Sequence, residues 1–131
     1  MNSIVIEYAE KLGDLGERII NISKKFNDME KLNTPEQIKE KYEISLDAIK
    51  GYKDCKLALM LIVVPNQVQK EHKEIVEAIQ MFIDGTEMMF SALDIERYSV
   101  DMDNIKQGLI MQEQGKERVV KLANQIAIKL S

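Results

Sequence analysis

Two prolines in this chain of 131 residues stand at places that predict the start of a helix. In "NTPEQI", Thr34 precedes Pro35, and Gln37 follows three residues after Thr34. This order favours a helix start, because Thr caps free N–H groups, Pro fits the first turn and the Gln side chain returns to the cap. "VPNQVQ" repeats the order, with Asn66 as the expected cap and Gln69 three residues later.

A third start is expected in "RYSVDMDN", where Ser99 or Asp101 offers an oxygen to the first free N–H groups of a helix. The three starts divide the chain into four segments of similar length. We therefore predict helices over residues 3–31, 35–63, 67–94 and 101–130.

Apolar residues recur every seven positions in each segment, which is typical of helices that pack side by side. No segment alternates as a half-buried strand does, and only the β-branched run 62–64 is expected to depart from helix. In the second helix the expected core column is less regular. Its members are Ile38, Tyr42, Leu46, Ile49 and Leu57. The pattern predicts one domain, residues 1–131, of all-α class and folded as an antiparallel up-down-up-down four-helix bundle.

All six glycines lie inside the predicted helices, where each costs about 1 kcal/mol relative to Ala. Most align with small residues seven positions apart, as Ala78 does with Gly85 in the third helix and Gly108 with Gly115 in the fourth. We expect these two columns to pack closely against each other. The alternative is that they surround a ligand. Gly13 lies outside the columns.

Composition excludes several classes of function. The net charge is −4 and basic residues are interleaved with acidic ones, which disfavours a nucleic-acid surface. The longest apolar run, residues 57–64, is far shorter than the roughly 20 residues of a membrane span. A single cysteine, Cys55, excludes an intramolecular disulfide. The start has no signal-peptide pattern, so we expect a cytoplasmic protein, with the cell envelope as the alternative.

The only histidine, His72, lies in "QKEHKE" between Glu71 and Glu74. On a helix these neighbours point in other directions, so the three side chains do not converge. A dimetal bundle also requires a Glu three residues before a His, and that position is Gln69. We therefore expect no metal and no cofactor, and a hydrogen-bonded core histidine with the Tyr8 hydroxyl as its partner.

A catalytic pair of Cys55 and His72 is the enzymatic alternative, but no orienting group or oxyanion donor accompanies it. We expect a buried thiol instead, and carboxylates that lie on polar helix faces. The sequence thus predicts no catalytic residues.

Excess apolar surface is the stronger clue to function. The third helix is apolar or small at five of seven positions over residues 78–95, whereas a bundle helix needs about three of seven. "LALMLIVV" likewise leaves no polar stripe. A second copy, the connection 94–101, or a partner or ligand is expected to cover this surface. The predicted interaction surface consists of Leu61, Ile62, Met81, Met88, Phe90 and Ile95.

Four residues of the segment 63–122 form a recognisable order: Pro65 before a helix, His72 about a turn and a half later, and Gly108 and Gly115 seven apart in the last helix. In this order the segment resembles uncharacterised helical-bundle domains of Gram-positive bacteria, many of them lipoproteins. The resemblance implies no known catalysis or cofactor. The expected function is non-enzymatic protein–protein contact, with a homodimer or another protein as partner. The alternatives are a bundle that binds a small apolar ligand or lipid, and the extracellular part of a lipoprotein.

Overall fold

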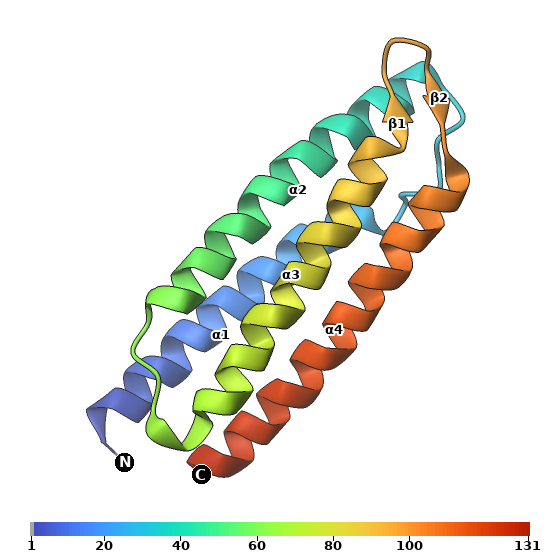
Figure 1. The fold of residues 1–131 in the computed structure, drawn as a ribbon. Helices are drawn as coiled ribbons and strands as arrows, with labels where there is room; N and C mark the ends of the chain where they lie inside the picture. The colour runs from blue at the N-terminus through green and yellow to red at the C-terminus, as the bar shows by residue number, and fades with distance from the viewer. Residues whose placement is uncertain (1) are drawn as a thin grey trace.

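Four long helices make up most of the chain, which confirms the predicted all-α class (Figure 1). The structure is a computed structural model that describes residues 2–131. The helices are α1 (Ser3–Ser23), α2 (Pro35–Leu61), α3 (Gln69–Ser91) and α4 (Met102–Leu130). Short elements lie between them, namely the 3₁₀ turns η1 (Lys24–Phe26) and η2 (Asn66–Val68) and the strands β1 (Leu93–Asp94) and β2 (Ser99–Val100).

The helices lie side by side along their lengths (Figure 1). The start of α1 and the end of α4 lie at one end of the molecule, together with the link from α2 to α3, and the β hairpin lies at the other. Backbone contacts are most extensive between α3 and α4, and are fewer between α2 and α3 and between α1 and α2. Helices α1 and α4 are not among the pairs with extensive contact.

Two of the three predicted helix starts are confirmed. The Thr34 hydroxyl accepts from the N–H of Gln37, whose side chain accepts in turn from the N–H of Thr34, so α2 begins with the expected capping box. The Asp101 carboxylate accepts from the N–H of Asn104 and caps α4.

The predicted cap at Asn66 is wrong. Asn66 lies in η2, and α3 begins only at Gln69, without a side-chain cap. The Gln69 amide donates to the carbonyl of Val64 instead, at 2.9 Å. A hydrogen bond to the preceding link has therefore replaced the reciprocal bond of a capping box.

Helices α1, α2 and α3 end earlier than predicted, whereas α4 ends at Leu130 as predicted. Helix α1 stops at Ser23 rather than at residue 31, because the chain tightens into η1 and then turns. After α2 the backbone becomes extended at Ile62, so the departure expected over 62–64 is confirmed. The β hairpin was not predicted, since strands of two residues are too short for an alternating pattern. Its turn includes Tyr98 with a positive φ of 51°.

Helices α3 and α4 pack at their glycines, as predicted. A Cβ added to Gly85 would lie 2.7 Å from the carbonyl oxygen of Gly108, and one added to Gly108 would lie 2.5 Å from that of Gly85. At Gly115 the carbonyl oxygen of Ala78 would lie at 3.2 Å. The distances at Gly85 and Gly108 leave no room for a side chain, and at Gly115 the neighbouring atoms would have to shift, so the glycines set the spacing of the two helices.

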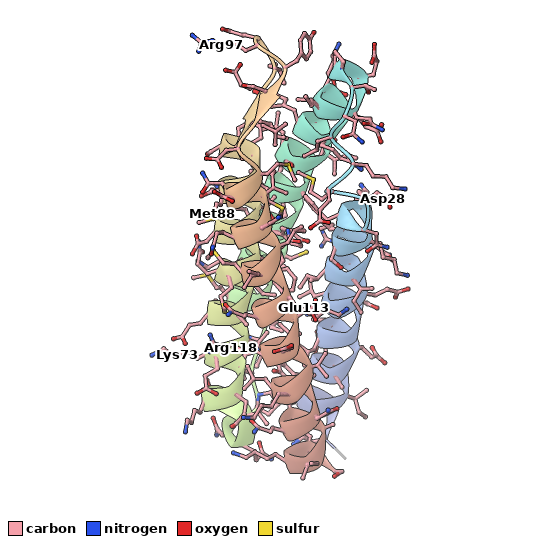
Figure 2. The ribbon with its side chains drawn as sticks, turned by 90° about the vertical axis from the view of Figure 1, so that its right-hand side faces the viewer. Asp28, Lys73, Met88, Arg97, Glu113 and Arg118 are labelled. Carbon is pink, nitrogen blue, oxygen red and sulfur yellow. The ribbon has the colours of Figure 1, made fainter. Side chains whose placement is uncertain are left out.

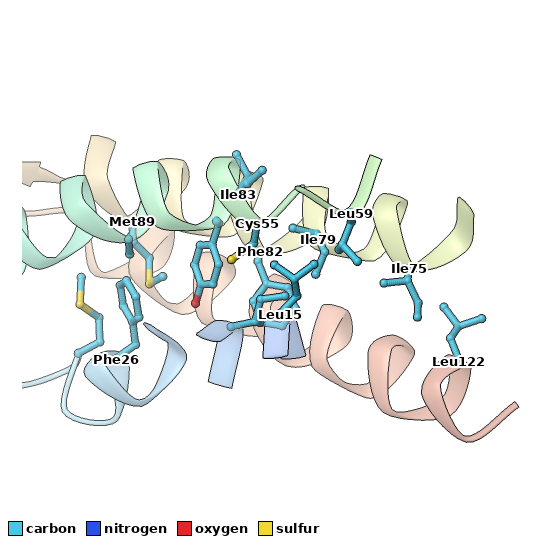
Figure 3. Packing of buried hydrophobic residues seen from close by; sticks show 14 of the residues in the cluster. Leu15, Phe26, Cys55, Leu59, Ile75, Ile79, Phe82, Ile83, Met89 and Leu122 are labelled. Carbon is cyan, nitrogen blue, oxygen red and sulfur yellow. The ribbon is translucent and has the colours of Figure 1, made fainter. Parts of the chain in front are cut away.

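The core runs between the helices and receives aliphatic side chains from each of them (Figure 3). In α2 the predicted core column is partly wrong, because Leu46 and Leu57 are 52% and 57% exposed. The helix instead turns a face rich in polar and small residues inward. The buried residues of α2 are Ile38, Lys41, Ser45, Ala48, Tyr52, Cys55 and Leu59. Two of the seven, Lys41 and Ser45, are polar, so a pattern of apolar residues does not detect them.

Candidate interaction surface

The six residues of the predicted interaction surface do not form one patch. Leu61 and Ile62 lie at the end of α2, whereas Ile95 lies in the hairpin beyond the far end of α3. Since α3 has 23 residues, these two ends are about 34 Å apart. Only Leu61 is mainly exposed, at 74%, and the other five residues are half-buried.

Intramolecular contacts cover much of the apolar surface of α3. The ring of Phe90 lies 4.6 Å from that of Tyr42 in α2, measured between centroids. Arg118 of α4 places Nη1 3.5 Å from the sulfur of Met81. Figure 2 shows Met88 on α3, opposite the side on which α1 lies. Neighbouring helices therefore cover much of the apolar surface predicted over residues 78–95, and Met88 is half-buried.

The exposed apolar residues concentrate instead at the C-terminal end of α2. Leu57, Met60, Leu61 and Val63 are 57%, 60%, 74% and 69% exposed. Leu57 and Leu61 are four residues apart and thus neighbours on the helix surface. We call these four residues the α2-end surface. The run "LALMLIVV" indicated this surface, because it has no polar stripe. Of the four residues, however, the predicted interaction surface included only Leu61.

A depression of about 450 Å³ adjoins the α2-end surface. It is lined by Met60, Ile62, Val64, Gln69, His72, Lys73 and Val76. Apolar side chains from the end of α2 and its link thus meet the first turns of α3. The α2-end surface and the depression together expose apolar groups from the end of α2 to the first turns of α3.

His72 joins three helices beneath this depression. Its Nδ1 lies 2.8 Å from the hydroxyl of Tyr8 in α1, and its Nε2 lies 2.7 Å from the carbonyl oxygen of Leu59 in α2. A carbonyl only accepts, so Nε2 donates, and in the neutral ring Nδ1 accepts from Tyr8. The predicted partnership of His72 and Tyr8 is confirmed. Burial, and secondly the charge of Glu71, raises the pKa of Tyr8 to about 12.

Glu71 corrects the expectation that carboxylates lie on polar faces, because it is only 4% exposed. Both of its oxygens accept from the ammonium of Lys129 in α4, at 2.9 and 3.0 Å. This hydrogen bond holds the pKa of Glu71 below its ordinary value, against the opposing effect of burial. The pair ties the start of α3 to the end of α4, and it was missed because residues 58 positions apart give no local signal.

Cys55 is fully buried, as predicted. Burial raises the pKa of its thiol, with a smaller opposing effect from Arg18. Both ring nitrogens of His72 are engaged elsewhere, and no hydrogen bond joins them to Cys55 among residues 2–131. The arrangement therefore lacks the contact by which a histidine activates a thiol.

Two hydroxyls in the core, those of Ser45 and Tyr52, have no hydrogen-bond partner. Both belong to the inward face of α2 and both side chains are fully buried. Within the part of the chain that the structure describes, no three His, Cys, Asp or Glu side chains gather where they could hold a metal ion. None of the helices described is long and apolar enough to cross a bilayer.

No family model, curated protein or solved structure matches this chain. The resemblance to Gram-positive bundle domains stays a prediction.

Proposed function

We propose that this chain is an antiparallel up-down-up-down four-helix bundle that acts through protein–protein contact and without catalysis. The observation that carries the proposal is the α2-end surface. Four large apolar side chains, each more than half exposed, occur there within seven residues. Contiguous exposed apolar groups of this kind mark sites of association in soluble proteins.

The partner we propose for this surface is a second copy of the chain, in a two-fold homodimer. A two-fold axis brings the same patch of each copy together, so Leu57 and Leu61 of one copy would pack against those of the other. The adjoining depression provides space for the protruding Leu61 or Val63 of the partner. We propose a cytoplasmic location, with the cell envelope as the alternative.

Sedimentation velocity on matched variants tests this proposal. In Leu57→Glu/Leu61→Glu, the two carboxylates would be buried in the interface without partners. Burial of each leucine contributes about 1.5 kcal/mol or more, so the dissociation constant should rise by about 100-fold or more. Leu46→Glu is the control, because Leu46 is 52% exposed on the same helix but lies outside the surface.

The expected result is a dimer for the wild type and for the control, and a monomer for the double variant. A wild type that sediments as a clean monomer at low micromolar concentration would refute self-association. A double variant that dimerises as well as the wild type would remove the α2-end surface from the proposal.

The alternative of a bundle that holds an apolar ligand among Gly85, Gly108 and Gly115 has less support. Those glycines are in close contact with the opposite helix, and close packing there leaves no cavity for a ligand. We therefore keep protein–protein contact as the proposed function.

A further inference from the structure

The four helices form two pairs that are packed to different extents. Helices α3 and α4 have the most extensive backbone contact in the bundle, and they approach each other closely at Gly85 and Gly108. Among the described residues, α1 has extensive contact with no α-helix other than α2. The α1–α2 pair is therefore joined to the α3–α4 pair mainly through the contacts of α2 with α3.

Buried hydrogen bonds hold α3 and α4 together. The amide of Gln112 in α4 donates to the hydroxyl of Thr86 at 2.7 Å, and that hydroxyl donates to the carbonyl oxygen of Phe82 at 2.6 Å. Thr86 is fully buried and Gln112 is 7% exposed. Nearer the link from α2 to α3, Glu71 accepts from Lys129 across the same two helices. Separation of α3 from α4 would thus leave buried polar groups without their partners.

The face that α2 turns to the core has the opposite character. The hydroxyls of Ser45 and Tyr52 have no hydrogen-bond partner among residues 2–131, and both side chains are fully buried. The ring of Tyr52 packs on that of Phe82 in α3, with 5.3 Å between the centroids. A buried hydroxyl without a partner has lost its hydrogen bonds to water, so it favours any form of the protein that water can reach.

Helix α4 does not close the other side of the α1–α2 pair. One depression of about 380 Å³ lies between α1 and the end of α4, and another of about 210 Å³ is lined by residues of η1 and α4. Gly13 of α1 lines the first depression, and a Cβ added there would meet no atom within 4 Å. Separation of α1 from α4 would therefore disrupt little backbone contact.

His72 forms the two buried hydrogen bonds that join the helix pairs. It lies on α3 and bonds to the hydroxyl of Tyr8 in α1 and to the carbonyl oxygen of Leu59 in α2. Both bonds lie close to the link from α2 to α3, in which residues 62–65 form no helix. The pairs are thus joined by buried bonds at the link, while the core face of α2 contributes unpaired hydroxyls.

We propose that the α1–α2 pair opens from the α3–α4 pair as one unit, with residues 62–65 as the hinge, while the α3–α4 pair stays folded. Units of this kind can open well below the free energy of global unfolding. Opening would give water access to the hydroxyls of Ser45 and Tyr52. It would also expose the thiol of Cys55, which is fully buried in the closed form that the structure shows (Figure 3).

Labelling of the Cys55 thiol by an aromatic disulfide reagent in native buffer measures the opening. The labelling rate, divided by the rate for the chain unfolded in urea, gives the population of forms in which Cys55 is exposed. Thr86→Val separates local opening from global unfolding, because it leaves the Gln112 amide without an acceptor inside the α3–α4 pair. It should lower the folding equilibrium constant by about tenfold or more, yet change the labelling rate by less than about threefold.

Ser45→Ala/Tyr52→Phe tests the cause of the opening. Removal of the unpaired hydroxyls should slow the labelling of Cys55 by about tenfold or more, because the closed form no longer buries them without partners. The matched control is Ser91→Ala/Tyr98→Phe, which removes the same two groups from exposed positions. This control should leave the labelling rate within about threefold of the wild-type rate.

Amide hydrogen exchange of the unmodified chain identifies the unit that opens. The slowest amides of α1 and α2 should share one rate of exchange. That rate should be at least about tenfold faster than the rate for the slowest amides of α3 and α4.

Three results would overturn the proposal. The first is labelling of Thr86→Val that accelerates in proportion to its loss of stability, because Cys55 would then be exposed only by global unfolding. The second is equal protection of all four helices, or exchange of α2 without α1. The third is labelling of Ser45→Ala/Tyr52→Phe at the wild-type rate. If Thr86→Val does not fold, the exchange measurement and the hydroxyl variants still decide the question. The opening concerns a single chain, so its failure leaves the sedimentation test of the α2-end surface unaffected.

Discussion

At the scale of single residues, His72 is a structural connection between helices. It lies on α3, and its two nitrogens bond to Tyr8 of α1 and to the backbone of α2 at Leu59. Helical periodicity was sufficient to turn His72 inward and to place Tyr8 at the same end of the bundle. The bond to the Leu59 carbonyl was not predictable, because that group is free only where α2 ends, and the end of α2 was placed two residues too late.

Tyr8→Phe should destabilise the protein, because it leaves the buried Nδ1 of His72 without a donor. The expected loss in the free energy of unfolding is about 1–3 kcal/mol, measured by urea denaturation. Tyr98→Phe is the matched control, since Tyr98 is 49% exposed and its hydroxyl has no bond to a described residue. Equal stability of the two variants would show that the Tyr8–His72 bond contributes nothing.

Glu71 should make stability depend on pH in the acid range. Its pKa is lower in the folded protein than its ordinary value of 4.5, so the folded state favours the carboxylate. The resulting stabilisation is complete above pH 4.5 and is lost as the pH falls through the lower, folded-state pKa. Thermal unfolding of Glu71→Gln should therefore depend less on pH below 4.5 than that of the wild type.

Glu7→Gln is the control for that measurement. The pKa of Glu7 is also lowered, by Lys11, but this pair is exposed and weakly coupled to folding. It should change the acid profile much less than Glu71→Gln does. Identical profiles for the two variants would contradict a special contribution from the Glu71–Lys129 pair.

At the scale of helices, the number of helices and the start positions of α2 and α4 could be predicted, because caps and prolines are local signals. The inward face of α2 could not be predicted. Lys41, Ser45 and Tyr52 are buried, while Leu46 and Leu57 are exposed. The orientation of α2 is set by contacts with other helices, such as the close approach of Ile22 to Gly51, and a single-helix pattern cannot contain that information.

The glycines allow the same substitution to be compared at a closed and at an open helix surface. Gly115→Leu should destabilise the bundle by about 3 kcal/mol or more, since its Cβ would already lie 3.2 Å from the Ala78 carbonyl oxygen and more atoms follow. Gly13→Leu should be neutral or stabilising by up to about 1 kcal/mol, because it gains helix propensity in open space. Thermal unfolding monitored by circular dichroism compares them. An unchanged melting temperature in Gly115→Leu would contradict the packing of α3 on α4.

At the scale of the whole molecule, the bundle is tight on one side and open on another. Glycines close the α3–α4 side, whereas small residues leave a groove between α1 and α4. The sequence indicated surplus apolar surface but located most of it on α3, where Tyr42 and Arg118 now cover Phe90 and Met81. Which apolar residues remain exposed depends on how the helices face one another, so only the structure could locate them.

The central claim is that a second copy of the chain covers the α2-end surface, and methionine methyl NMR tests it most directly. Met60 belongs to that surface and is 60% exposed, while Met102 is 36% exposed in α4 and lies outside it. In a dilution series of the unmodified sequence, the Met60 methyl signal should shift or broaden with protein concentration, and that of Met102 should stay fixed. A Met60 signal that does not change with concentration, from a protein that remains monomeric, would contradict the claim.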